Sequence, residues 1–73
     1  MSRLPVISGR EAAKAFKKDG WILVRWRGSH MILIKEGKEA TLSIPDHREL
    51  GRGLLRSLVR DADLTVEEFT RLL

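Results

Sequence analysis

Two strand-forming segments separated by only Gly28 and Ser29 constrain the fold of this chain most strongly. The segments Trp21–Arg27 and His30–Lys35 are rich in β-branched and aromatic side chains, which favour strands. A two-residue Gly-Ser turn joins antiparallel strands, so we expect a β-hairpin. Alternation along the first segment predicts one face with Ile22, Val24 and Trp26 and another with Leu23, Arg25 and Arg27.

The length of this turn decides which side chains lie beside His30. With a two-residue turn, Arg27 pairs with His30 and Arg25 lies opposite Ile32, so both arginines share a face with the imidazole. A three-residue turn shifts the register by one and places His30 beside Trp26. The sequence leaves both registers open.

Helices are predicted on both sides of the strands. Ser8 and Glu11 form a capping box, and the helix that they begin ends near Gly20. A turn at Glu36–Glu39 leads to a third strand, Ala40–Ile44, which Pro45 ends. After a polar loop, Pro45–Arg52, a second helix buries Leu54, Leu55, Leu58 and Val59.

A second capping box, Thr65–Glu68, begins a short terminal helix. The predicted order is therefore α-β-β-β-α with a short C-terminal helix. This is an α+β fold, a three-stranded antiparallel sheet with two helices on one face.

Length and composition exclude several classes of protein. The chain has 73 residues, no cysteine and two histidines, so residues 1–73 are expected to form a single domain with a small core. Disulfides, thiolate zinc sites and cysteine nucleophiles are excluded, and two distant histidines argue against a metal site. Met31–Ile34 is the longest apolar run, too short to span a bilayer. We expect a cytoplasmic protein that uses no metal, cofactor or membrane.

Positive charge is concentrated in the first third of the chain. The net charge is +4, and residues 1–27 carry seven basic side chains against two acidic ones. Such a distribution suits a polyanion, of which nucleic acid is the most common in the cell. Lys14, Lys17 and Lys18 are expected on the solvent face of the first helix, where they would attract RNA.

Several short motifs together resemble the HicA family of messenger-RNA-cleaving toxins across nearly the whole chain. They are Pro5, Ser8-Gly9, Gly20-Trp21, Gly28-Ser29-His30, Pro45-Asp46-His47, and Gly53 ahead of Leu55-Arg56-Ser57-Leu58. The chain departs from the family pattern at Trp21, where phenylalanine is usual, at Leu54, where threonine is usual, and at Arg27, where lysine or another polar residue is common.

The resemblance implies a double-stranded-RNA-binding-domain-like fold, a ribonuclease activity that halts translation, and a HicB-like antitoxin as partner. It also implies that His30 is the catalytic residue. Histidine titrates near neutral pH, and Arg25 and Arg27 would hold the phosphate if they share its face.

Other residues have two interpretations each. His47 is either a second proton carrier or a loop residue that caps the following helix or bonds to backbone. Ser29 either binds phosphate or serves only the turn. Trp21 and Trp26 either stack on bases or fill the core. Arg52, Arg56 and Arg60 bind either RNA or acidic groups of an antitoxin. A non-catalytic RNA-binding module and a protein-interaction domain remain alternative functions.

Overall fold

The computed structural model describes residues 3–73, and the other two residues of the expected domain, Met1 and Ser2, lie outside the described residues. Within this range the elements are α1 (Gly9–Lys18), β1 (Ile22–Arg27), β2 (His30–Ile34), β3 (Leu42–Pro45), α2 (Arg52–Asp61) and α3 (Val66–Leu72). The strands form one antiparallel sheet in the order β1-β2-β3. The predicted α+β order and the short terminal helix are confirmed.

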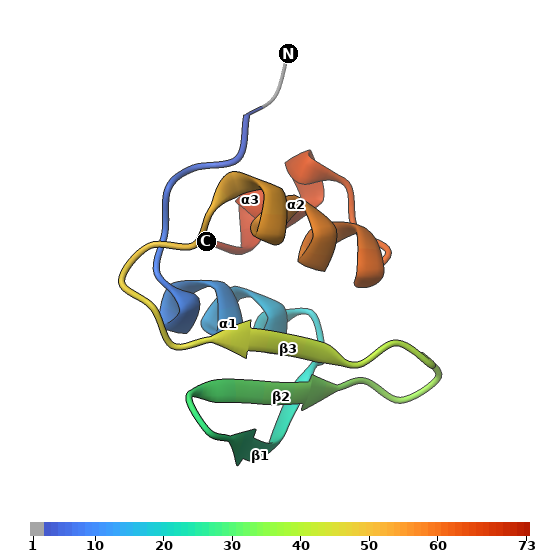
Figure 1. Ribbon diagram of the computed structural model, residues 1–73. Coiled ribbons are helices and arrows are strands. Elements are labelled where there is room, and N and C mark those ends of the chain that lie inside the picture. Colours follow the sequence, from blue (N-terminus) through green and yellow to red (C-terminus); the bar gives the residue numbers. More distant parts are fainter. Residues whose placement is uncertain (1–2) are drawn as a thin grey trace.

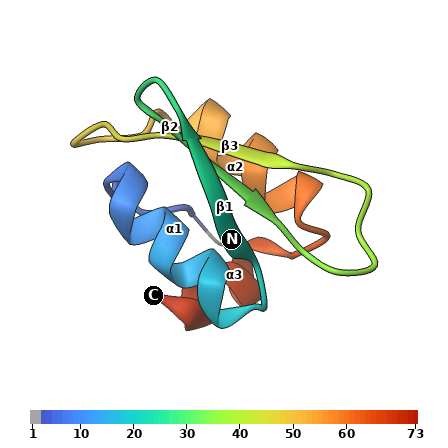
Figure 2. The same cartoon turned by 90° about the horizontal axis from the view of Figure 1, so that it is seen from below.

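The molecule has two layers. All three helices lie on one side of the sheet, and the opposite face carries no helix (Figures 1 and 2). The core between the layers takes Met31 and Leu33 from β2 and Leu42 and Ile44 from β3. Among the described residues, no helix has the length and apolar character needed to cross a membrane.

Both predicted capping boxes are present, and they fix where α1 and α3 begin. Ser8 Oγ accepts the Glu11 N–H at 3.0 Å while the Glu11 carboxylate accepts the Ser8 N–H at 2.9 Å. Thr65 and Glu68 make the same reciprocal pair. Helix α3 packs on α1 through the rings of Phe16 and Phe69, whose centroids lie 4.9 Å apart.

A β-bulge at Val24 changes which side chains of β1 share a face. Leu23 pairs with Leu33 and Arg25 with Ile32, so the pairing skips Val24. An extra residue in one strand reverses the alternation beyond it. The predicted faces are therefore wrong: Leu23 and Trp26 share the helix-covered face, and Ile22, Arg25 and Arg27 share the uncovered one.

The ends of two strands also differ from the prediction. Strand β3 was expected over Ala40–Ile44 but spans Leu42–Pro45, and Pro45 pairs with His30. A proline is tolerated there because β3 is an edge strand that needs no N–H on its outer side. Strand β2 ends at Ile34, and Lys35 turns to Asp19, with 3.2 Å between the ammonium and the carboxylate.

One of the four leucine and valine residues predicted to be buried in α2 is exposed. Leu55, Leu58 and Val59 are buried as expected, whereas Leu54 is 41% exposed. The three buried residues have the spacing i, i+3 and i+4, which places them on one stripe. Leu54 precedes Leu55 by one residue, about 100° around the helix, and so faces solvent in the first turn.

Candidate active site

The hairpin register settles the surroundings of His30. Arg27 pairs directly with His30, and Trp26 pairs with Met31, so the turn consists of Gly28 and Ser29 alone. Gly28 has φ +58°, a left-handed conformation that glycine adopts without steric cost. The register that would place His30 beside Trp26 is excluded.

Arg25, Arg27 and His30 lie together on the uncovered face, at its hairpin end; we call them the hairpin cluster. Arg27 is the direct cross-strand neighbour of His30, and Arg25 lies one pair further along the same face. Side chains in such positions are about 4.5–8 Å apart at Cβ, within reach of a common phosphate. All three side chains and Ser29 are exposed. Within residues 3–73 no ion pair engages either arginine.

Backbone hydrogen bonds join the Pro45–His47 segment to the hairpin turn and to the start of α1. The Asp46 N–H donates to the Ser29 carbonyl at 2.8 Å, and the Gly9 N–H donates to the His47 carbonyl at 2.9 Å. Gly9 is required for this approach, because a Cβ there would lie 1.9 Å from the Pro45 carbonyl oxygen. His47 is thus held next to the start of α1, at the same end of the molecule as the hairpin.

A side-chain pair reinforces this junction. Arg10 donates two hydrogen bonds to the Asp46 carboxylate, at 3.0 and 3.1 Å, and its guanidinium lies 5.9 Å from the centroid of the Trp26 ring. The bonds from Arg10, with smaller contributions from the charges of Arg10 and His47, lower the pKa of Asp46 below its ordinary value. In turn, the hydrogen bonds to Asp46 and its negative charge raise the pKa of Arg10. Asp46 therefore stays ionised and anchored near neutral pH.

His47 does not cap helix α2. The N-cap of α2 is Gly51, and no side chain caps this helix by a hydrogen bond. The imidazole of His47 is exposed. Its backbone carbonyl is the group engaged, by Gly9. The structure therefore leaves the His47 side chain accessible to solvent near the hairpin.

The three lysines predicted to attract RNA do not form one patch with the hairpin cluster. Lys14 and Lys17 line a groove between α1 and the helix-covered side of β1, together with Trp26. Lys18 lines a different hollow, beside Leu72 and Leu73 at the end of α3, and Lys14 lines that hollow as well. Of the two tryptophans, Trp21 is in the core at 2% exposure and Trp26 is 47% exposed.

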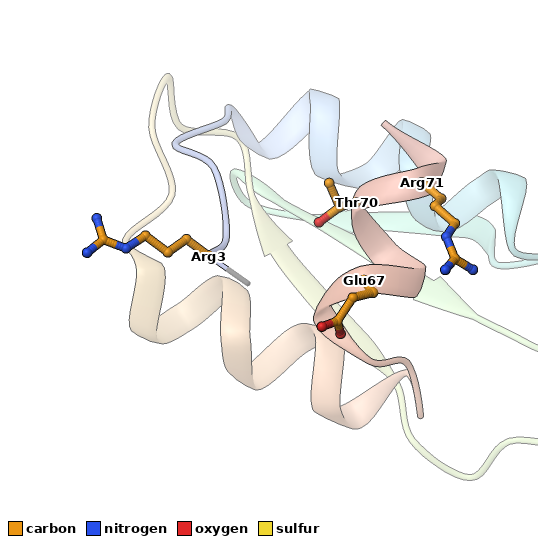
Figure 3. Close-up of a pocket in the computed structure, with 4 residues that line it drawn as sticks. All are labelled: Arg3, Glu67, Thr70 and Arg71. Atoms are coloured by element: carbon orange, nitrogen blue, oxygen red, sulfur yellow. The ribbon is translucent and has the colours of Figure 1, made fainter. Parts of the chain in front are cut away.

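A larger hollow, of about 460 Å³, lies on the helical side of the molecule and does not belong to this site. It is lined by Arg3, Glu67, Thr70 and Arg71, none of which comes from the sheet (Figure 3). Arg3 and Arg71 point in opposite directions there, so their charges do not converge on one ligand.

The junction of Gly9, Arg10 and Asp46 was not predicted from the sequence. Arg10 and Asp46 are separated by 36 positions, and no local pattern pairs them. The one available signal is Gly9 itself, because glycine in the first turn of a helix is unfavourable and its presence indicates a close backbone approach.

The chain is similar to a protein of a toxin–antitoxin system. A chain in a solved structure described as a toxin–antitoxin complex from Streptococcus pneumoniae is 30% identical, with a TM-score of 0.71; the match covers 80% of the present chain and 98% of that chain. A search of curated proteins finds no match.

The family follows from a match to residues 9–64 by the family described as the HicA toxin of bacterial toxin–antitoxin. The chain belongs to the HicA toxin family, as the sequence resemblance implied, and is a toxin component.

Proposed function

We propose that this toxin is a metal-independent endoribonuclease that cleaves messenger RNA in the cytoplasm and arrests translation, with His30 as general acid or base. The observation that carries the proposal is the direct pairing of His30 with Arg27 on an exposed sheet face, with Arg25 next along it. A proton carrier beside two guanidinium groups that make no ion pair within residues 3–73 meets the needs of phosphodiester cleavage.

The reaction uses the ribose 2′-hydroxyl of the RNA as the nucleophile. Its oxygen forms a bond to the adjacent phosphorus while the bond from phosphorus to the 5′-oxygen breaks, leaving a 2′,3′-cyclic phosphate and a 5′-hydroxyl. His30 accepts the proton of the 2′-hydroxyl or donates one to the departing 5′-oxygen. Arg27 and Arg25 stabilise the additional charge of the phosphorane through guanidinium hydrogen bonds, with Ser29 available as a further donor.

His47 is the candidate for the second proton transfer. The proposal is supported by the backbone bonds of its segment to Ser29 on one side and to Gly9 on the other, together with the exposure of its imidazole. Without it, one positioned proton carrier supplies typically 10²–10⁴-fold, which suits a slow enzyme.

The decisive experiment compares His30→Ala with the parent on message-like RNA in the presence of a metal chelator. We expect cleavage to fall at least about 100-fold while RNA binding, measured by fluorescence anisotropy, is unchanged. Cleavage by His30→Ala at the parent rate would contradict the catalytic assignment, and binding without cleavage by the parent would favour a non-catalytic RNA-binding module. His47→Ala, tested in parallel, loses activity only if His47 carries a proton.

The proposal includes a HicB-like antitoxin as the protein partner. It is supported by the family match and by the toxin–antitoxin complex in which the similar chain occurs. The uncovered sheet face also exposes Ile22 and Ile34 beyond the hairpin cluster, and a protein that binds there would cover His30 as well.

A further inference from the structure

A groove between α1 and β1 combines cationic and aromatic side chains on the side of the sheet opposite to His30. Its volume is about 270 Å³, and its lining includes Arg10, Lys14, Lys17, Leu23, Trp26 and Met31. Helix α1 contacts β3 and α3, and β1 is the strand of the sheet farthest from β3 (Figure 1). The space is just below the roughly 300–1,000 Å³ of typical small-molecule pockets, so it suits one planar group.

Trp26 is an unusual residue to leave exposed in this position. The chain has only four aromatic residues, and the other three are at most 2% exposed, whereas Trp26 is 47% exposed. The guanidinium of Arg10 lies 5.9 Å from the centroid of the Trp26 ring, and the same guanidinium makes two hydrogen bonds to Asp46. Each contact that restricts the ring before binding reduces the conformational freedom lost when a ligand stacks on it.

The charge around the groove lies on one stripe of α1. Arg10, Lys14 and Lys17 have the spacing i, i+4 and i+7, which places them on a single helix face. No ion pair within residues 3–73 involves Lys14 or Lys17. Ammonium groups without carboxylate partners beside an exposed ring are the components of single-strand nucleic-acid sites. The apolar part of the lining consists of Ala13, Leu23, Trp26 and Met31. The three cations around it favour a polyanion over the apolar face of a peptide helix.

We propose that this α1–β1 groove binds an unpaired base of single-stranded RNA, stacked on Trp26, with the neighbouring phosphates on Lys14 and Lys17. The inference rests on the proposed function, since it adds a substrate subsite to cleavage at His30. The pair of Trp26 with Met31 is adjacent to the pair of Arg27 with His30, on the opposite face. Because β1 is an edge strand, an RNA strand that crosses this edge contacts both the groove and the hairpin cluster.

The test measures RNA affinity in the non-cleaving His30→Ala background, by anisotropy of a short fluorescein-labelled single strand and of the same sequence as a duplex. Trp26→Ala is expected to bind the single strand roughly 5- to 150-fold more weakly, the range for loss of one stacked base, and the duplex unchanged. Trp26→Phe retains a stacking ring and most of the affinity. The matched control is Ile22→Ala, which removes an exposed apolar side chain of the same strand outside the groove and leaves affinity unchanged.

Two further readouts separate stacking from a structural role. RNA binding quenches the emission of Trp26, and this quenching is absent in Trp26→Phe, where only the buried Trp21 remains. Lys14→Ala combined with Lys17→Ala lowers the slope of log affinity against log salt by about 1.4, at about 0.7 per phosphate contact of a single strand.

Unchanged single-strand affinity in Trp26→Ala overturns the proposal, and so does an equal loss of duplex affinity. If Trp26→Ala loses antitoxin binding but keeps RNA binding, the proposal is also overturned, because the groove would then be a protein-docking site. A parent that fails to cleave RNA contradicts the proposed function alone, since the groove is tested by binding in a variant that does not cleave.

Discussion

Gly9→Ala is the substitution for which local and tertiary effects predict opposite results. In an isolated helix, alanine is more favourable than glycine by up to about 1 kcal/mol. In this protein, the added Cβ would lie 1.9 Å from the Pro45 carbonyl oxygen and 3.0 Å from its carbonyl carbon. Carbon–oxygen contacts normally settle at about 3.3–3.6 Å, so α1 and the Pro45–His47 segment must separate by more than about 1 Å.

The cost of that separation follows from what the junction contains. Overpacking of a well-filled site typically costs about 1–3 kcal/mol. The hydrogen bond from the Gly9 N–H to the His47 carbonyl, 2.9 Å long, contributes about 1 kcal/mol if it is lost. After allowance for helix propensity, we expect Gly9→Ala to lower the free energy of unfolding by about 1–3 kcal/mol. For a domain of this size the melting temperature would fall by roughly 5–20 °C.

The assay is thermal and urea unfolding followed by circular dichroism, with Gly53→Ala as the matched control. Gly53 is also a helical glycine, in α2, but nothing lies within 4 Å of the position that a Cβ would take there. Gly53→Ala should therefore raise stability by up to about 1 kcal/mol. If Gly9→Ala melts at or above the parent temperature while Gly53→Ala behaves as expected, the close contact at the junction is refuted.

Two further predictions concern α2 and the Arg10–Asp46 pair. Leu55→Ala, at a fully buried position, should cost about 2–5 kcal/mol, whereas Leu54→Ala should stay within about 0.5 kcal/mol; similar urea midpoints for the two variants would contradict the burial pattern. Arg10 holds the pKa of Asp46 below its ordinary value of 3.8. The contribution of the pair to stability is therefore present above pH 3.8 and is lost as the pH falls through the lowered pKa of the folded state. Asp46→Asn should be less stable than the parent at pH 7, and the difference should shrink as the pH falls below 3.8; a difference that stays the same throughout acid titration would argue against the ion pair.

Local sequence patterns predicted the helices well, because the signals that begin and end them are short-range. Ser8 with Glu11, and Thr65 with Glu68, satisfy each other's backbone groups within one turn, so their spacing alone is sufficient. The same reasoning failed for Leu54, since α2 contains two adjacent leucines, Leu54 and Leu55, and only packing in the folded protein selects which of them is buried.

The candidate site was predicted only in part. The residues of the hairpin cluster were named from the sequence, but two registers were open, and the faces of β1 were assigned wrongly because a bulge at Val24 has no signal in an alternating apolar strand. The pairing of Arg27 with His30 depends on the hydrogen-bond ladder between two strands, which a single strand's sequence does not contain.

By itself, the sequence determined the order of elements, the positive charge of the first third and the presence of His30 after a Gly-Ser turn. Each of these depends on neighbours along the chain. Only the tertiary structure decided the junction of Gly9, Arg10 and Asp46 and the groove at Trp26. Both arise from segments distant in the sequence that meet when α1 packs on the sheet, and the strength of such contacts depends on distances that only the folded chain defines.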